Sequence, residues 1–109
     1  MANQPIPVEK ATLMMQQYVA YMTGLGVDMS QQTQTVSFNA NDLKHWIDDV
    51  MPFTDEFRIC MCVYPPTDAN AGKTTVAIWP YKDGSPARTD TGKGVPVEIE
   101  PFNEGQGQP

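Results

Sequence analysis

The chain of 109 residues carries 7 basic and 13 acidic side chains, which gives a net charge of −6 at pH 7. This length suits one domain built around one hydrophobic core. A hydrophobic content of 40% with 18% charged residues is typical of a globular protein rather than a disordered one. Because the chain is acidic and has no cluster of Lys and Arg, we expect neither a nucleic acid nor a membrane surface as its partner.

The first helical pattern begins near residue 8. Apolar residues recur there at steps of three and four: Val8, Ala11, Met15, Tyr18, Val19 and Met22. Gly24 and Gly26 supply a natural end to the helix. Leu13, Met14 and Tyr21 lie off this stripe, so the helix is apolar over a wide arc and is expected to contact more than one surface.

The strongest local signal in the chain is a helix start at Asn39. Asn39 is a good N-cap, and Asp42 stands at the third helical position, where a carboxylate suits the free backbone amides. Phe38 and Leu43 occupy the two positions of a hydrophobic staple. One buried face follows at helical spacing: Leu43, Trp46, Ile47 and Val50. We therefore predict a second helix over about residues 40–50.

The remaining elements read as strands. Residues 35–38 form a short β-prone piece, and residues 57–64 and 74–79 most simply pair as an antiparallel hairpin with a long loop. A last half-exposed strand is predicted at 95–99, where Pro96 places it at an edge because proline cannot donate to a β-ladder.

Together these elements predict the α+β class. Two helices pack on a small, mainly antiparallel sheet of three or four strands, in the order α-β-α-β-β-β. A single domain spans residues 1–102, and residues 103–109 form a flexible tail.

The two faces of the predicted hairpin carry different kinds of residue. One face has Phe57, Ile59, Met61 and Val63, with Val76 and Ile78 on the partner strand; the other has Arg58, Cys60, Cys62 and Tyr64, with Ala77, Trp79 and Tyr81. We expect the first face to be core. The second is low in charge for a solvated face, so we expect both faces to be covered. A partner subunit is one way to cover the second face, which favours a homodimer.

Cys60 and Cys62 share one strand face and invite comparison with a metal site. A structural zinc site takes four ligands, yet the chain has only these two cysteines and a single histidine, His45. Parallel side chains at i and i+2 also suit a disulfide poorly. We interpret both cysteines as small buried hydrophobes and expect no metal or cofactor.

His45 is the one candidate for a catalytic base. Asp42 and Asp49 are three and four residues away and can share its helix face, which is the minimum for general base chemistry. A solvated helix face is the commoner explanation, since no motif places a nucleophile nearby.

Arg58 lies between two apolar residues and is expected to be partly buried. A buried guanidinium needs a carboxylate partner or a bound anion, and Glu98 or Glu100 on the last strand is the expected partner. The alternative is a pocket for an anion or small molecule, lined by Arg58, Tyr64, Trp79 and Tyr81.

Four segments between Val36 and Pro109 carry a resemblance to known proteins: VSFNANDLKHWI, FRICMCVYPP, GKTTVAIWPYKDG and FNEGQGQP. With them the chain resembles a group of small α+β proteins of uncharacterised function found widely in Bacteroidetes. Those relatives often end in a glycine-rich tail with cysteine and proline, whereas the tail here has no cysteine. The resemblance implies the fold and brings no activity with it.

We therefore expect a non-enzymatic module that self-associates or binds a protein partner. Its candidate ligand or interface residues are Arg58, Cys60, Cys62, Tyr64, Trp79 and Tyr81. The alternatives are a sensor with a pocket at Arg58 and a small enzyme that uses His45 with a nearby aspartate. The start of the chain lacks the pattern of a secretion signal, and two unpaired cysteines fit a reducing compartment, so a cytoplasmic location is expected.

Overall fold

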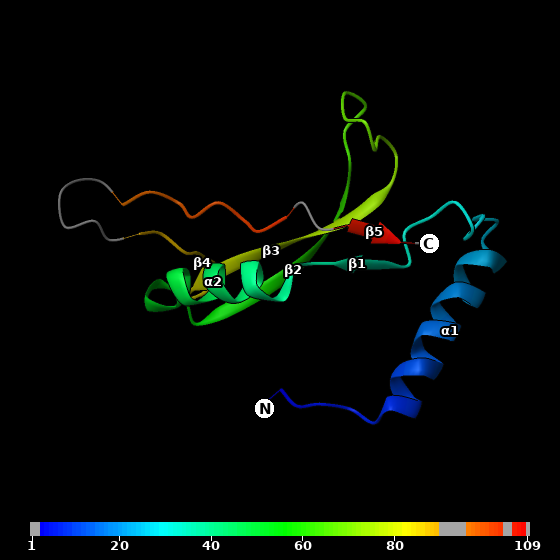
Figure 1. The fold of residues 1–109 in the computed structure, drawn as a ribbon, viewed down its shortest axis with the longest axis horizontal. Helices are drawn as coiled ribbons and strands as arrows, with labels where there is room; N and C mark the ends of the chain where they lie inside the picture. The colour runs from blue at the N-terminus through cyan, green and yellow to red at the C-terminus, as the bar shows by residue number, and fades with distance from the viewer. Residues whose placement is uncertain (1–2, 90–95, 104–105, 109) are drawn as a thin grey trace.

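The computed structural model describes residues 3–89, 96–103 and 106–108. It confirms the α+β class (Figure 1). The elements in chain order are α1 (Val8–Gly24), β1 (Thr35–Ser37), α2 (Ala40–Val50), a 3₁₀ turn (Met51–Phe53), β2 (Glu56–Val63), β3 (Thr74–Lys82), β4 (Ser85–Pro86) and β5 (Gln106–Gln108). One antiparallel sheet has the order β2-β3-β4, and β1 pairs with β5 in a second, two-stranded sheet.

Helix α2 begins and ends where its sequence signals place it. The side chain of Asn39 accepts a hydrogen bond from the backbone N–H of Asp42 at 3.1 Å, as an N-cap does. At the other end, Pro52 lies in the 3₁₀ turn that follows the helix. The Thr54 hydroxyl then donates to the carbonyl of Val50 at 2.7 Å, which satisfies one of the last free carbonyls.

The central element of the fold is the hairpin of β2 and β3. The two strands are antiparallel, with Arg58 opposite Trp79 and Ile59 opposite Ile78. Strand β3 turns into β4 through Asp83 and Gly84, whose φ angles of 53° and 79° are those of a tight two-residue hairpin turn. An Asp-Gly pair is the sequence that predicts a turn of this kind.

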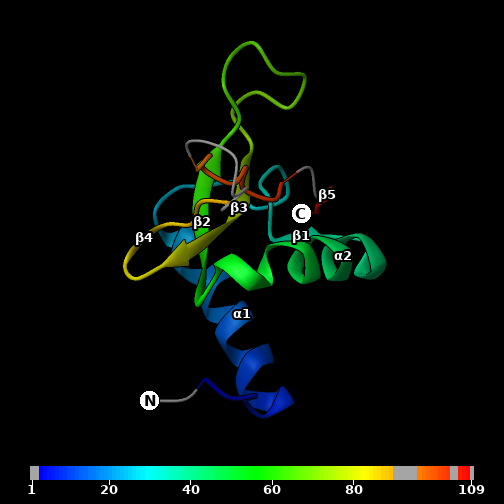
Figure 2. The same cartoon turned by 90° about the vertical axis from the view of Figure 1, so that its left-hand side faces the viewer.

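The core lies where α2 covers one end of this sheet (Figure 2). Val50, Ala87 and Ile99 are buried, and three half-buried aromatic residues pack on them: Trp46, Phe53 and Phe57. The rings of Trp46 and Phe57 lie 5.7 Å apart, and those of Trp46 and Phe102 lie 5.1 Å apart. The aromatic contacts tie α2 both to β2 and to the C-terminal segment.

The C-terminal segment differs from the expected edge strand at 95–99. Position 95 lies outside the described residues, and over 96–103 the segment makes only two isolated bridges, Arg88 with Glu98 and Ile78 with Phe102. Pro96 and Pro101 have no N–H to donate, which explains why no regular ladder forms. Farther on, within the stretch expected as a tail, Gln106–Gln108 pairs with Thr35–Ser37; residues 104, 105 and 109 lie outside the described part of the chain.

Helix α1 stands apart from the rest of the fold (Figure 1). All seventeen of its residues are described, and none is buried. The molecule is accordingly extended: its radius of gyration is 16.8 Å, against about 13 Å for a compact chain of this length. Within the described residues, no helix is long and apolar enough to cross a membrane.

Candidate interaction surface

The expectation that Ile59, Met61 and Val63 belong to the core is wrong. Their exposed fractions are 67%, 76% and 62%, and only Phe57 on the same face packs against the buried cluster. The reason is the position of the helices. Helix α2 covers only the Phe57 end of the hairpin, and α1 does not lie flat on the rest. The expectation that both faces of the hairpin are covered is therefore also wrong.

A second exposed apolar surface lies on α1. Leu13, Met14, Met15, Tyr18 and Tyr21 are all exposed large hydrophobic residues. The chain has no charged residue from 11 to 27, so this arc carries no charge of either sign. The prediction that α1 packs against more than one surface is not met by burial, because none of its residues is buried.

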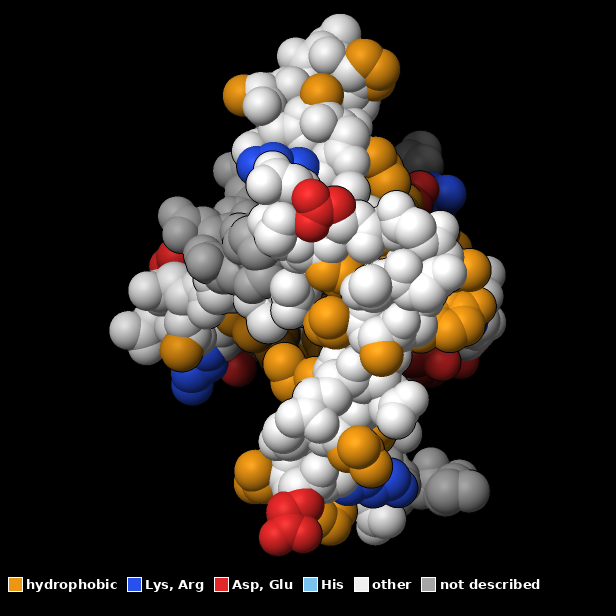
Figure 3. All heavy atoms as spheres, turned by 90° about the vertical axis from the view of Figure 1, so that its right-hand side faces the viewer, with side chains coloured by type: hydrophobic (Ala, Val, Ile, Leu, Met, Phe, Trp, Pro, Cys, Tyr) orange, Lys and Arg blue, Asp and Glu red, His pale blue; other side chains and the backbone are white. Residues whose placement is uncertain are grey.

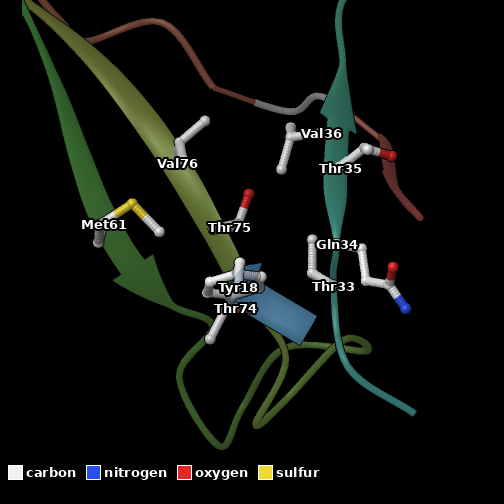
Figure 4. Close-up of a pocket in the computed structure, with 9 residues that line it drawn as sticks. All are labelled: Tyr18, Thr33, Gln34, Thr35, Val36, Met61, Thr74, Thr75 and Val76. Carbon is white, nitrogen blue, oxygen red and sulfur yellow. The ribbon is translucent and has the colours of Figure 1, made fainter. Parts of the chain in front are cut away.

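The two apolar surfaces meet at a groove. A cavity of about 320 Å³ is lined by Met14, Met15, Tyr18 and Val19 of α1 together with Gln34 and Met61. A cavity of about 200 Å³ adjoins it, lined by Tyr18 and Met61 together with residues 33–36 and 74–76. In Figure 4 the Met61 side chain extends from β2 toward β3, and Val36 lies on β1 beyond β3. Seen from the α1 end, apolar side chains gather where this helix approaches the sheet (Figure 3). We call the exposed residues Leu13, Met14, Met15, Tyr18, Ile59, Met61 and Val63 the α1–β2 surface.

The opposite face of the hairpin is centred on Arg58, which is exposed rather than partly buried. Its Nε donates to Oε1 of Glu56 at 2.8 Å, so the expected pairing with Glu98 or Glu100 is wrong. The guanidinium carbon also lies 4.0 Å from the centre of the Tyr81 ring, within the range of a cation–π contact. The hydrogen bond that Arg58 donates to Glu56 raises the pKa of Arg58 above its already high ordinary value. Arg58 is thus already paired within the hairpin, which does not favour an anion site.

The other candidates on this face are half-buried. Cys60 and Cys62 are free thiols whose sulfurs contact the backbone carbonyls two residues before them, at 3.9 and 3.4 Å. The Nε1 atom of Trp79 is buried and, within the described chain, has no hydrogen-bond partner. The backbone of Tyr64 pairs with the residue just before β3: its N–H donates to the carbonyl of Lys73 at 3.0 Å. The register brings Arg58, Trp79 and Tyr81 together, and Cys60 and Cys62 lie farther along the same face.

The expected His45 cluster lies on the exposed side of α2. His45, Asp42 and Asp49 are all exposed, and the neighbouring Lys44 pairs with Asp48 at 2.6 Å. His45 does not line the cavities beside α1 described above. Over the described residues, no group of three or more His, Cys, Asp or Glu side chains is arranged to hold a metal ion.

Sequence reasoning singled out the Arg58 face and missed the α1–β2 surface. The available signal was the wide apolar arc of α1, in which Leu13 and Met14 lie off the main stripe. An apolar arc this wide has more apolar surface than one contact covers, which is the signal that marks the exposed face of α1. The chain matches no family model, no curated protein and no solved structure. The resemblance noted from sequence therefore stays a prediction.

Proposed function

We propose that this protein is a non-enzymatic interaction module that self-associates through the α1–β2 surface. The observation that carries the proposal is the amount of exposed area. The chain exposes 8438 Å², whereas a compact monomer of its mass exposes about 6,000 Å². A standard interface buries about 800 Å² on each partner, so one third of this excess is enough for a stable contact.

A second copy fits the surface better than other partners do. Ile59, Met61 and Val63 on β2 and the arc of α1 are apolar and uncharged, while the acidic residues that give the net charge of −6 lie elsewhere. A two-fold contact brings the same patch of both copies together, so each copy supplies an apolar cover for the other. A membrane surface fits poorly, because an interfacial helix needs Lys and Arg on its polar face and α1 has only Lys10.

Light scattering coupled to gel filtration tests this function directly. The wild-type chain should elute with twice the monomer mass. Ile59→Lys combined with Met61→Lys should give a monomer, because a buried unpaired charge opposes association. Val97→Lys is the matched control, since Val97 is 63% exposed and lies off the α1–β2 surface; it should remain a dimer. A strictly monomeric wild-type chain overturns the proposal.

A cytoplasmic location is part of the same proposal. Its support is chemical: Cys60 and Cys62 are both free thiols, and free thiols persist in a reducing compartment. Detection of both thiols in reduced form in protein taken directly from cells, by alkylation before lysis, tests the point. A stable disulfide in that sample speaks against it.

A further inference from the structure

Strand β2 presents an open backbone edge as well as an apolar face. The Tyr64 N–H donates to Lys73, and the register continues in steps of two, so even-numbered residues of β2 bond to β3. The N–H and C=O groups of Phe57, Ile59, Met61 and Val63 therefore point away from β3. In the described part of the chain, no other strand pairs with β2 on that side. An apolar edge strand eight residues long is a template for another strand.

We propose that two copies pair their β2 strands antiparallel about a two-fold axis at Cys60, which specifies the self-association proposed above and rests on it. In this register Phe57 lies opposite Val63 of the second copy, and Ile59 lies opposite Met61 of the second copy. All four outward-facing residues of each strand then find partners, which gives about eight inter-chain hydrogen bonds. The two three-stranded sheets become one continuous sheet with a shared apolar face.

The neighbouring registers leave some of the outward-facing backbone groups of β2 without a suitable partner. An axis at Met61 places Phe57 opposite Pro65 of the second copy, which has no N–H to donate. An axis at Ile59 leaves Val63 opposite Asp55 of the second copy, outside β2. An axis at Arg58 sets two guanidinium groups face to face, which is unfavourable for directly opposed side chains. Only the axis at Cys60 keeps all four outward-facing residues paired within β2.

The Cys60 axis also sets the distances between thiols. The two Cys60 residues face each other at a non-hydrogen-bonded position, where Cα atoms lie about 4.5 Å apart, within the range a disulfide spans. Each Cys62 lies opposite Arg58 of the second copy. The two Cys62 residues are thus four positions out of register, about 13 Å apart along the strands, which is too far for a disulfide.

Disulfide trapping tests this register. Cys62→Ser protein, which keeps only Cys60, is treated with copper phenanthroline in air; each pair of thiols loses two protons and two electrons to oxygen and forms one S–S bond. On a non-reducing gel its covalent dimer should exceed that of Cys60→Ser protein, which keeps only Cys62, by at least about tenfold. Comparable yields, or a larger yield from the Cys62-only protein, overturn the register.

A second variant tests the same register in case the geometry of the Cys60 pair is too strained to form a disulfide. Arg58→Cys in the Cys60→Ser background places a cysteine opposite Cys62 of the second copy, so it should form a covalent dimer in high yield. If neither this variant nor the Cys60-only protein forms one while light scattering still reports a dimer, edge pairing is wrong and self-association stands. If light scattering reports a monomer, the proposed function itself fails.

Discussion

Replacement of Ile59 by alanine tests the α1–β2 surface at its centre. Ile59 is 67% exposed in one copy, so about two-thirds of its side chain remains to be buried on association. Loss of three carbon groups at about 0.8 kcal/mol each removes about 1.6 kcal/mol per copy, or about 3 kcal/mol from a symmetric dimer. Because 1.4 kcal/mol is a tenfold change, the dissociation constant of the dimer should rise roughly 200-fold.

Sedimentation velocity over a concentration series measures this dissociation constant. Val97→Ala is the control, because Val97 has a similar exposed fraction of 63% and lies off the surface; its dissociation constant should match that of the wild type. Ile59→Ala should cost the isolated fold only about 0.8 kcal/mol, since one third of the side chain is buried, and a urea titration verifies that the variant is folded. A wild type that dimerises, with an Ile59→Ala constant within about threefold of it, refutes the reasoning.

Three further predictions concern the fold beneath the surface. Val50→Ala should lower the free energy of unfolding by about 2 kcal/mol and the Tm by roughly 10 °C in calorimetry, because Val50 is buried in the core. Asn39→Ala should cost about 1 kcal/mol in urea unfolding, since it removes the cap on the N–H of Asp42. The Ser30 hydroxyl donates to Asp28 at 2.6 Å and lowers the pKa of Asp28. Ser30→Ala should therefore raise the pKa of Asp28 toward its ordinary value in an NMR titration. The ionised Asp28 carboxylate contributes stability that is lost as the pH falls through its pKa, so in the variant this loss should occur at a higher pH than in the wild type.

The parts of the fold predicted correctly are those that local chemistry determines. The cap at Asn39 and the apolar stripe that follows specify α2 within one stretch of chain. The Asp83-Gly84 turn requires two positive φ angles, which those residue types tolerate. Each signal lies within a few residues of the structure it produces, so it does not depend on the rest of the molecule.

The covering of the hairpin depends on distant elements, and there prediction from the sequence was wrong. Alternation along β2 correctly separates Ile59, Met61 and Val63 from Arg58 and Cys60. It does not say which helix, if any, lies over either face. The partner of Arg58 shows the same limit: Glu56, two residues away on the same strand, forms the ion pair that was expected from Glu98 or Glu100. Contacts between elements are set by tertiary packing, which local patterns leave open.

The exposed face of β2 and its open edge call for a single explanation. A strand that alternates Ile59, Met61 and Val63 with less apolar residues has the pattern of one buried on one side, yet those three side chains are exposed in one copy. An exposed apolar edge is a site where strands of other chains add, unless one closed arrangement satisfies it. Antiparallel pairing about Cys60 uses each edge once and leaves no free edge at the joint. The proposed dimer therefore accounts for the open edge of β2, and it places Ile59 of each copy beside Met61 of the other.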